Sequence, residues 1–162
     1  MQTFVKASLA AALSIAAISP AIAGEKQIVV ESQAAMQEWQ QDVGNSLDRR
    51  LVTATRQTRT NPVNGIVQLR FTLDASGKPH DIEVYSGSGD SATDTLAKRA
   101  VRGLTELAEA PVANAEAQTF QANIIFAEDA RSYRKLAKKL AVSENVRLAQ
   151  ADSEGGVISF GL

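Results

Sequence analysis

Residues 65–89 read GIVQLRFTLDASGKPHDIEVYSGSG, and this stretch decides the fold. Apolar and polar residues alternate from Val67 to Leu73, a period of two that predicts a strand with one buried face. The sequence DASG at 74–77 then supplies a turn in which Gly77 suits a positive φ. Alternation resumes at 81–86. The stretch therefore predicts an antiparallel hairpin that leaves its second strand through a Ser/Gly turn.

A helix is predicted on each side of this hairpin. Before the hairpin, apolar residues recur at steps of three and four, which places them on one stripe of a helix. These residues are Met36, Trp39, Val43, Leu47, Leu51 and Ala54. After the hairpin, Ser91 and Asp94 form a capping pattern, and a second apolar stripe runs from Leu96 to Leu104. Trp39, the single Trp, is expected to anchor the first helix on the sheet.

A third strand is predicted where apolar residues alternate again, from Phe120 to Phe126. A crossover through the second helix should bring this strand back beside the first one. We therefore predict an α+β fold. It is a two-layer sandwich with a three-stranded antiparallel sheet, two helices on one face and a C-terminal helical extension.

This order of elements resembles the C-terminal domain of the TonB family, over residues 36–126. The resemblance rests on Trp39 with Val43 and Leu47, Pro62, the alternating strand from Gly65 to Phe71, the Asp74 and Gly77 turn, the Ser86-Gly87-Ser88-Gly89 exit, Asp94-x-x-Ala97-x-x-Ala100-Val101 and the strand that ends at Phe126. It implies a TonB C-terminal-like fold and a protein-binding module without catalysis. The implied partner is the periplasmic segment of an outer-membrane transporter, or another envelope protein.

The chain departs from the energy-transducing members of that family. Those members keep an N-terminal anchor and a long Pro-rich spacer, whereas this chain has four Pro in total and no such spacer. The resemblance therefore implies a soluble periplasmic member that keeps the binding module. A role in energy transduction stays open.

The first 23 residues have the pattern of a secretory signal peptide. Lys6 gives a short basic start, an apolar run follows, and an A-x-A site ends at Ala23. We expect cleavage after Ala23 and a periplasmic protein, and an uncleaved anchor is the alternative. Beyond it we expect a linker at 24–35, the TonB C-terminal-like domain at 36–127, and a basic helix with a flexible tail at 128–162.

The segment after Asp129 has two interpretations. Leu136 and Leu140 lie at helical spacing, among the basic residues Arg131, Arg134, Lys135, Lys138 and Lys139. A basic amphipathic helix can lie on an anionic membrane surface or in a partner's groove. Alternatively, the helix docks on the domain and leaves a solvated basic face. Residues 157–162 are either disordered or a short strand.

Composition and motifs argue against an enzyme. The chain has no Cys, which removes thiolate catalysis and Cys-based metal sites. His80 is the single His, and because no G-x-S-x-G elbow accompanies it, we expect a solvated surface residue. A formal net charge of −1 does not indicate a nucleic-acid partner. We therefore expect no catalytic residue, no metal and no cofactor.

The expected binding site is the open edge of the third strand. An extended partner segment can add to such an edge by β-augmentation, held by main-chain hydrogen bonds. The residues are Thr119, Phe120, Gln121, Ala122, Asn123, Ile124, Ile125 and Phe126. In the alternative hypothesis, the tail from Val157 to Leu162 covers this edge, in its own chain or in a second copy. The protein is then a self-capped or homodimeric structural domain of the envelope.

Overall fold

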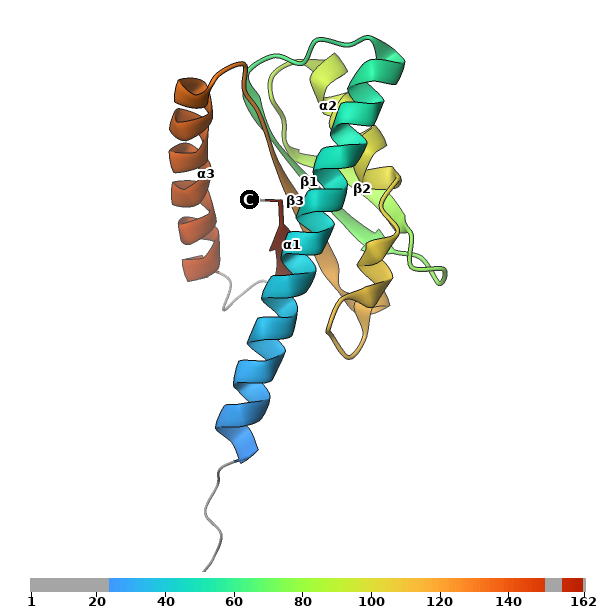
Figure 1. The fold of residues 1–162 in the computed structure, drawn as a ribbon, viewed down its shortest axis with the longest axis vertical. Helices are drawn as coiled ribbons and strands as arrows, with labels where there is room; N and C mark the ends of the chain where they lie inside the picture. Colours follow the sequence, from blue (N-terminus) through green and yellow to red (C-terminus); the bar gives the residue numbers. More distant parts are fainter. Residues whose placement is uncertain (1–23, 151–155, 162) are drawn as a thin grey trace, which may run out of the picture.

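The computed structural model describes residues 24–150 and 156–161, so the expected signal peptide lies outside the described residues. Figure 1 shows the arrangement of the elements. In chain order they are α1 (Gly24–Thr58), β1 (Gly65–Leu73), β2 (Pro79–Ser86), α2 (Ser91–Arg102), the 3-10 helices η1 (Glu106–Glu109) and η2 (Ala115–Ala117), β3 (Thr119–Phe126), α3 (Ala130–Gln150) and β4 (Val157–Phe160). None of the described helices is long and apolar enough to cross a membrane.

The sheet has four strands in the order β2-β1-β3-β4. As predicted, β1 is antiparallel to both β2 and β3, with Gly65 opposite Phe126 and Phe71 opposite Phe120. The fourth strand, β4, runs parallel to β3. The α+β class is therefore confirmed, but the prediction of a three-stranded antiparallel sheet is wrong, because the sheet is four-stranded and mixed.

The turn between β1 and β2 is built around one carboxylate, as the DASG sequence predicts. The side chain of Asp74 accepts hydrogen bonds from the backbone N–H groups of Ser76 (2.8 Å) and Lys78 (3.0 Å). Gly77 has a φ of 74°, and a Cβ at this position would lie 2.4 Å from the Cβ of Ala108. Glycine therefore meets both a conformational and a steric demand at this point.

Helices α1 and α2 lie on the same face of the sheet, as predicted, and enclose the apolar core (Figure 1). Trp39 is 6% exposed and packs against Phe120 and Phe160, with ring centroids 6.0 and 5.9 Å away. Its Nε1 donates to the backbone oxygen of Glu106 (3.2 Å), which satisfies its polar end. Trp39 is thus the anchor of α1 that the sequence predicts.

The N-terminal cap of α2 differs from the prediction. Asp90, not Ser91, caps the helix, because its Oδ2 accepts from the N–H of Thr93 (2.8 Å). Asp94 instead accepts from the N–H and the hydroxyl of Ser88, at 2.9 and 2.8 Å. Asp94 therefore holds the Gly-rich exit from β2 in place.

Helix α3 covers the face of the sheet opposite to α1 and α2 (Figure 1). That face of the sheet has several polar side chains, yet Gln68, Gln121 and Asn123 are at most 6% exposed. The pattern in β1 predicts one buried face, but α3 buries the second face as well.

The C-terminal tail returns to the sheet through α3. A parallel neighbour needs a long connection, usually a helix, and α3 provides it. The four residues of β4 pair with β3 from Thr119–Val157 to Ala122–Phe160. The tail expected to be flexible is therefore a strand in this structure. A run of four residues has too little periodicity to predict its partner in a sheet.

Helix α1 is longer than the sequence analysis predicts. It begins at Gly24, so residues 24–35, expected as a linker, lie within it. Helix-forming residues dominate this stretch, and it has no internal Pro or Gly to end a helix.

Candidate interaction edge

The outer edge of β3 is divided into two halves. Residues 119–122 are paired with β4, whereas residues 123–126 have no strand beside them in the described part of the chain. Both halves belong to the predicted site. The open half is therefore a strand edge about four residues long, next to the end of β4.

Four side-chain contacts hold β4 on the first half. The ring of Phe160 is 4% exposed and lies 6.2 Å from the ring of Phe71, in addition to its contact with Trp39. The side chain of Gln40 donates to the backbone oxygen of Ser159 (2.8 Å). From the other side, Arg147 donates to the hydroxyl of Ser159 (3.3 Å). The strand is thus held by both α1 and α3.

Gly161 marks the boundary between the two halves. Its φ is 99°, and a Cβ there would lie 2.5 Å from the backbone oxygen of Asn123. The carbonyl group of Asn123 therefore faces the outer edge of β3. Because backbone groups two residues apart in a strand point to the same side, the N–H and C=O of Ile125 face this edge too.

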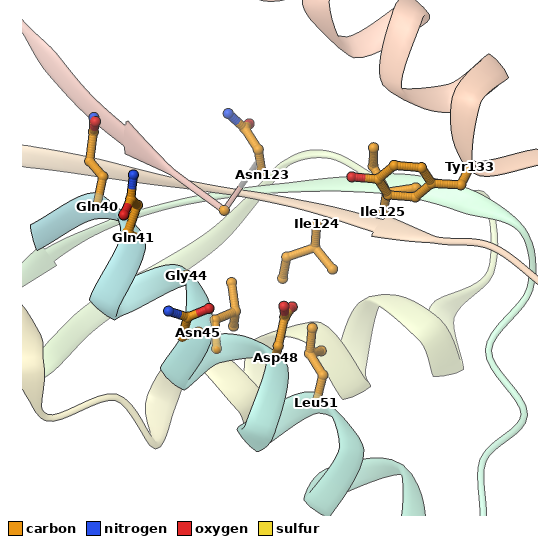
Figure 2. Close-up of a pocket in the computed structure, with 12 residues that line it drawn as sticks. Gln40, Gln41, Gly44, Asn45, Asp48, Leu51, Asn123, Ile124, Ile125 and Tyr133 are labelled. Atoms are coloured by element: carbon orange, nitrogen blue, oxygen red, sulfur yellow. The ribbon is translucent and has the colours of Figure 1, made fainter. Parts of the chain in front are cut away.

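A hollow of about 420 Å³ lies beside the open half, between α1, β3 and the start of α3. Figure 2 shows Asp48 and Ile124 directed into the space between the helix and the strand, with Tyr133 beside Ile125. Asp48, Leu51 and Ile125 also line a second hollow of about 400 Å³ that continues toward Ala127. The two hollows form a groove alongside the open edge, with polar and apolar residues on its α1 wall.

A layer of buried amides lies under α3, on the other face of the sheet. The Nε2 groups of Gln68 and Gln121 both donate to Asn123 Oδ1, at 2.9 and 3.0 Å. The same two groups donate to Glu144 Oε1, at 3.0 and 2.8 Å. All four amide N–H bonds therefore have an acceptor, which a buried polar group requires.

Glu144 connects this layer to β4. Burial opposes ionisation of its carboxyl, but hydrogen bonds from Arg147, Gln121 and Gln68, together with the charge of Arg147, outweigh burial and hold its pKa below the ordinary value. Its Oε2 accepts from Arg147 Nε and Nη2, at 3.0 and 2.9 Å. Because Arg147 also reaches Ser159, the pair links α3 to the strand that covers the edge.

The comparison with known families identifies this part of the chain. Residues 55–127 match the family described as Gram-negative bacterial TonB protein C-terminal. These residues are a TonB-type C-terminal domain. Neither the comparison with curated proteins nor the comparison with solved structures found a match.

The family match supports a general role for the TonB-type domain. TonB C-terminal domains are non-enzymatic protein-interaction modules of the Gram-negative envelope, linked to transport. The matched residues include β1, β2, α2 and β3, and hence the edge described above. Helix α3 and β4 lie beyond the match.

The structure distributes the eight predicted edge residues among different environments. The side chain of Gln121 donates to Glu144 and to Asn123, and the side chain of Phe120 is in the core. Ile125 is half-buried beside the hollow. The sequence analysis missed the α1 wall of the groove, to which Asp48 belongs. It also missed Glu144, for which the spacing to Arg147 (i, i+3) was the one available signal.

His80 lies outside these features. It is exposed and pairs with Asp81 (3.0 Å) at the surface, as the sequence analysis expects. No group of three or more potential metal ligands occurs among the described residues.

Proposed function

We propose that the TonB-type domain binds an extended segment of another envelope protein at the outer edge of β3, beginning at residues 123–126. The observation that carries this proposal is an uncovered strand edge with a groove beside it, in a domain of a protein-interaction family. An added strand continues the line of β4 along the same edge. Outer-membrane transporters with a periplasmic segment are the partner class that the family suggests.

The groove supplies contacts beyond the main chain. Alternate side chains of an added strand point to opposite faces of the sheet. One set lies over Asp48 and Leu51 of α1, and the other lies toward Tyr133 of α3. A few main-chain hydrogen bonds contribute about 0.5–1.5 kcal/mol each, so we expect micromolar or weaker binding without these side-chain contacts.

Ile125 offers a matched pair of variants to test this proposal. Ile125→Pro removes the one edge-facing N–H in the middle of the open half, and edge positions tolerate Pro. We expect it to weaken binding of a peptide from the periplasmic segment of an outer-membrane transporter (a TonB-box peptide). The loss should be about tenfold or more, because one main-chain hydrogen bond and those next to it are lost. Ile125→Ala keeps the N–H and should weaken binding about two- to threefold. Equal effects of the two variants, measured by calorimetry, contradict strand addition here.

A second function is favoured by one observation, namely that β4 already covers residues 119–122. We infer that the tail caps the edge and protects it from non-specific pairing, which is a common remedy for exposed strands. A cap of this kind limits an incoming segment to the open half as long as β4 stays in place. In the other version of this hypothesis, the tail caps the edge of a second copy and the protein is a homodimer. This version stays a prediction.

A further inference from the structure

The first part of α3 has a concentrated positive charge. Five cations lie between Arg131 and Lys139, and this segment has no acidic residue. The whole chain has 17 Lys and Arg against 18 Asp and Glu, so the rest of the chain has 12 cations against 18 acids. Charge is therefore separated, with a positive segment on one helix and an excess of negative charge elsewhere.

Four of the five cations lie on the side of α3 that faces away from the sheet, and Lys139 lies on its flank. Leu140, which is fully buried, marks the inner side of α3, together with Glu144 and Arg147. At 3.6 residues per turn, the cations fall within an arc of about 140° centred opposite Leu140. Each of the five is exposed, and none takes part in an ion pair within residues 24–150 and 156–161. Their charge is thus not neutralised by the domain itself.

The same outer face becomes apolar further along the helix. Val142 and Val146 lie in the same arc as the cations and are 65% and 52% exposed. These exposed valines give the outer face of α3 an apolar end beside its row of cations.

The shape of this face favours a bilayer over a protein groove. Two hollows border α3 through its inner and flanking residues, Tyr133 in one case and Leu136, Lys139 and Ser143 in the other. The helix α3 lies on the outside of the molecule (Figure 1). A membrane offers laterally mobile anionic headgroups, which can match a row of cations without shape complementarity.

We propose that the outer face of α3 binds the surface of an anionic lipid bilayer. Arg131, Arg134, Lys135 and Lys138 contact the headgroup phosphates, and Val142 and Val146 lie at the boundary with the acyl chains. Because the groove lies between α1, β3 and the inner side of α3, the outer face of α3 can rest on a membrane while the groove stays accessible. The inference does not depend on the function proposed for the β3 edge.

Vesicle co-sedimentation of the chain from Gly24 to Leu162 tests this inference. We expect binding to phosphatidylcholine vesicles that contain phosphatidylglycerol, little binding to phosphatidylcholine alone, and loss of binding as salt is raised. The variant Arg134→Gln, Lys135→Gln, Lys138→Gln should bind at least about tenfold more weakly, since each cation near an anionic surface contributes several-fold.

The matched control removes the same charge elsewhere, through Lys78→Gln, Arg99→Gln and Arg102→Gln, all at exposed positions. This control should keep most of the binding. Equal losses in the two triple variants, or equal binding to neutral and anionic vesicles, overturn the proposal. So does binding to soluble polyglutamate without binding to anionic vesicles, which assigns the face to an acidic protein partner.

Discussion

At the scale of single residues, the carboxylate of Glu144 satisfies two buried amides and one guanidinium group. Its Oε1 accepts from Gln68 and Gln121, and its Oε2 accepts from Arg147. A buried donor that loses its acceptor costs more free energy than the hydrogen bond itself contributes. Glu144 is therefore the charged residue of α3 whose replacement should affect the domain most.

The variant Glu144→Ala should lower the free energy of unfolding by about 2 kcal/mol, because it leaves two amide donors and Arg147 without this acceptor. Glu144→Gln keeps one acceptor oxygen and should cost about half as much. Urea denaturation measures both values. Glu128→Ala, at an exposed position just before α3, serves as the control and should have little effect. A larger loss for Gln than for Ala contradicts the acceptor role.

The pKa of Glu106 predicts how the free energy of unfolding depends on pH. A hydrogen bond from the Ser46 hydroxyl (2.6 Å) is the main cause that lowers the pKa of this carboxyl to about 2. Because this pKa lies below the ordinary value of 4.5, the unfolded state binds more protons at intermediate acidity. The free energy of unfolding should therefore fall as the pH is lowered from about 5 toward 2.

The variant Glu106→Gln should flatten this dependence, as measured by urea denaturation at several pH values. Glu116→Gln, at an exposed position on η2, is the control. An unchanged slope in Glu106→Gln would contradict the role given to the Ser46 bond.

The structural roles of some residues can be predicted from the neighbouring sequence, and the roles of others cannot. Asp74, Gly77 and Trp39 could be predicted, because a turn sequence and a helical stripe are visible within a few neighbours. The role of Glu144 could not be predicted, since its partners lie 76 and 23 positions away. Gln68 and Gln121 are buried because α3 covers their face of the sheet. The alternation of residues within β1 and β3 does not show that a helix lies there.

At the scale of elements, the hairpin, the two core helices and the third strand follow from periods of two and 3.6. The connection of α3 to β4 does not. The inner side of α3 includes polar residues, so its apolar helical stripe is weak. The strand β4 has only four residues, too few for a clear alternating pattern. The site is affected in the same way: the strand was predicted, but its division into a covered and an open half depends on β4.

Removing residues 155–162 tests the capping role of β4. The deletion exposes the edge at residues 119–122 and the space left by Phe160. We expect faster amide exchange of edge-facing groups on β3, since their partner strand is gone. We also expect a greater tendency to associate, visible as a higher mass in light scattering. Unchanged exchange and unchanged mass count against the cap. Leu148→Ala, at an exposed position on α3, is a control that leaves β4 intact.

At the scale of the whole molecule, two separate surfaces can be distinguished. The open half of β3 and its groove lie beside α1, and the basic ridge is the outer face of α3. The match to the TonB C-terminal family covers the first surface, and α3 with β4 extends beyond it. The extension therefore adds a second surface without blocking the open half of the edge.

The central claim is that residues 123–126 receive an extended partner segment. The most direct measurement is an amide chemical-shift titration of the chain from Gly24 to Leu162 with a TonB-box peptide. We predict shifts that cluster on residues 123–126, on the groove residues of α1 and on Tyr133. Shifts that cluster on the other sheet edge, along β2, or no shifts at millimolar peptide, would contradict it.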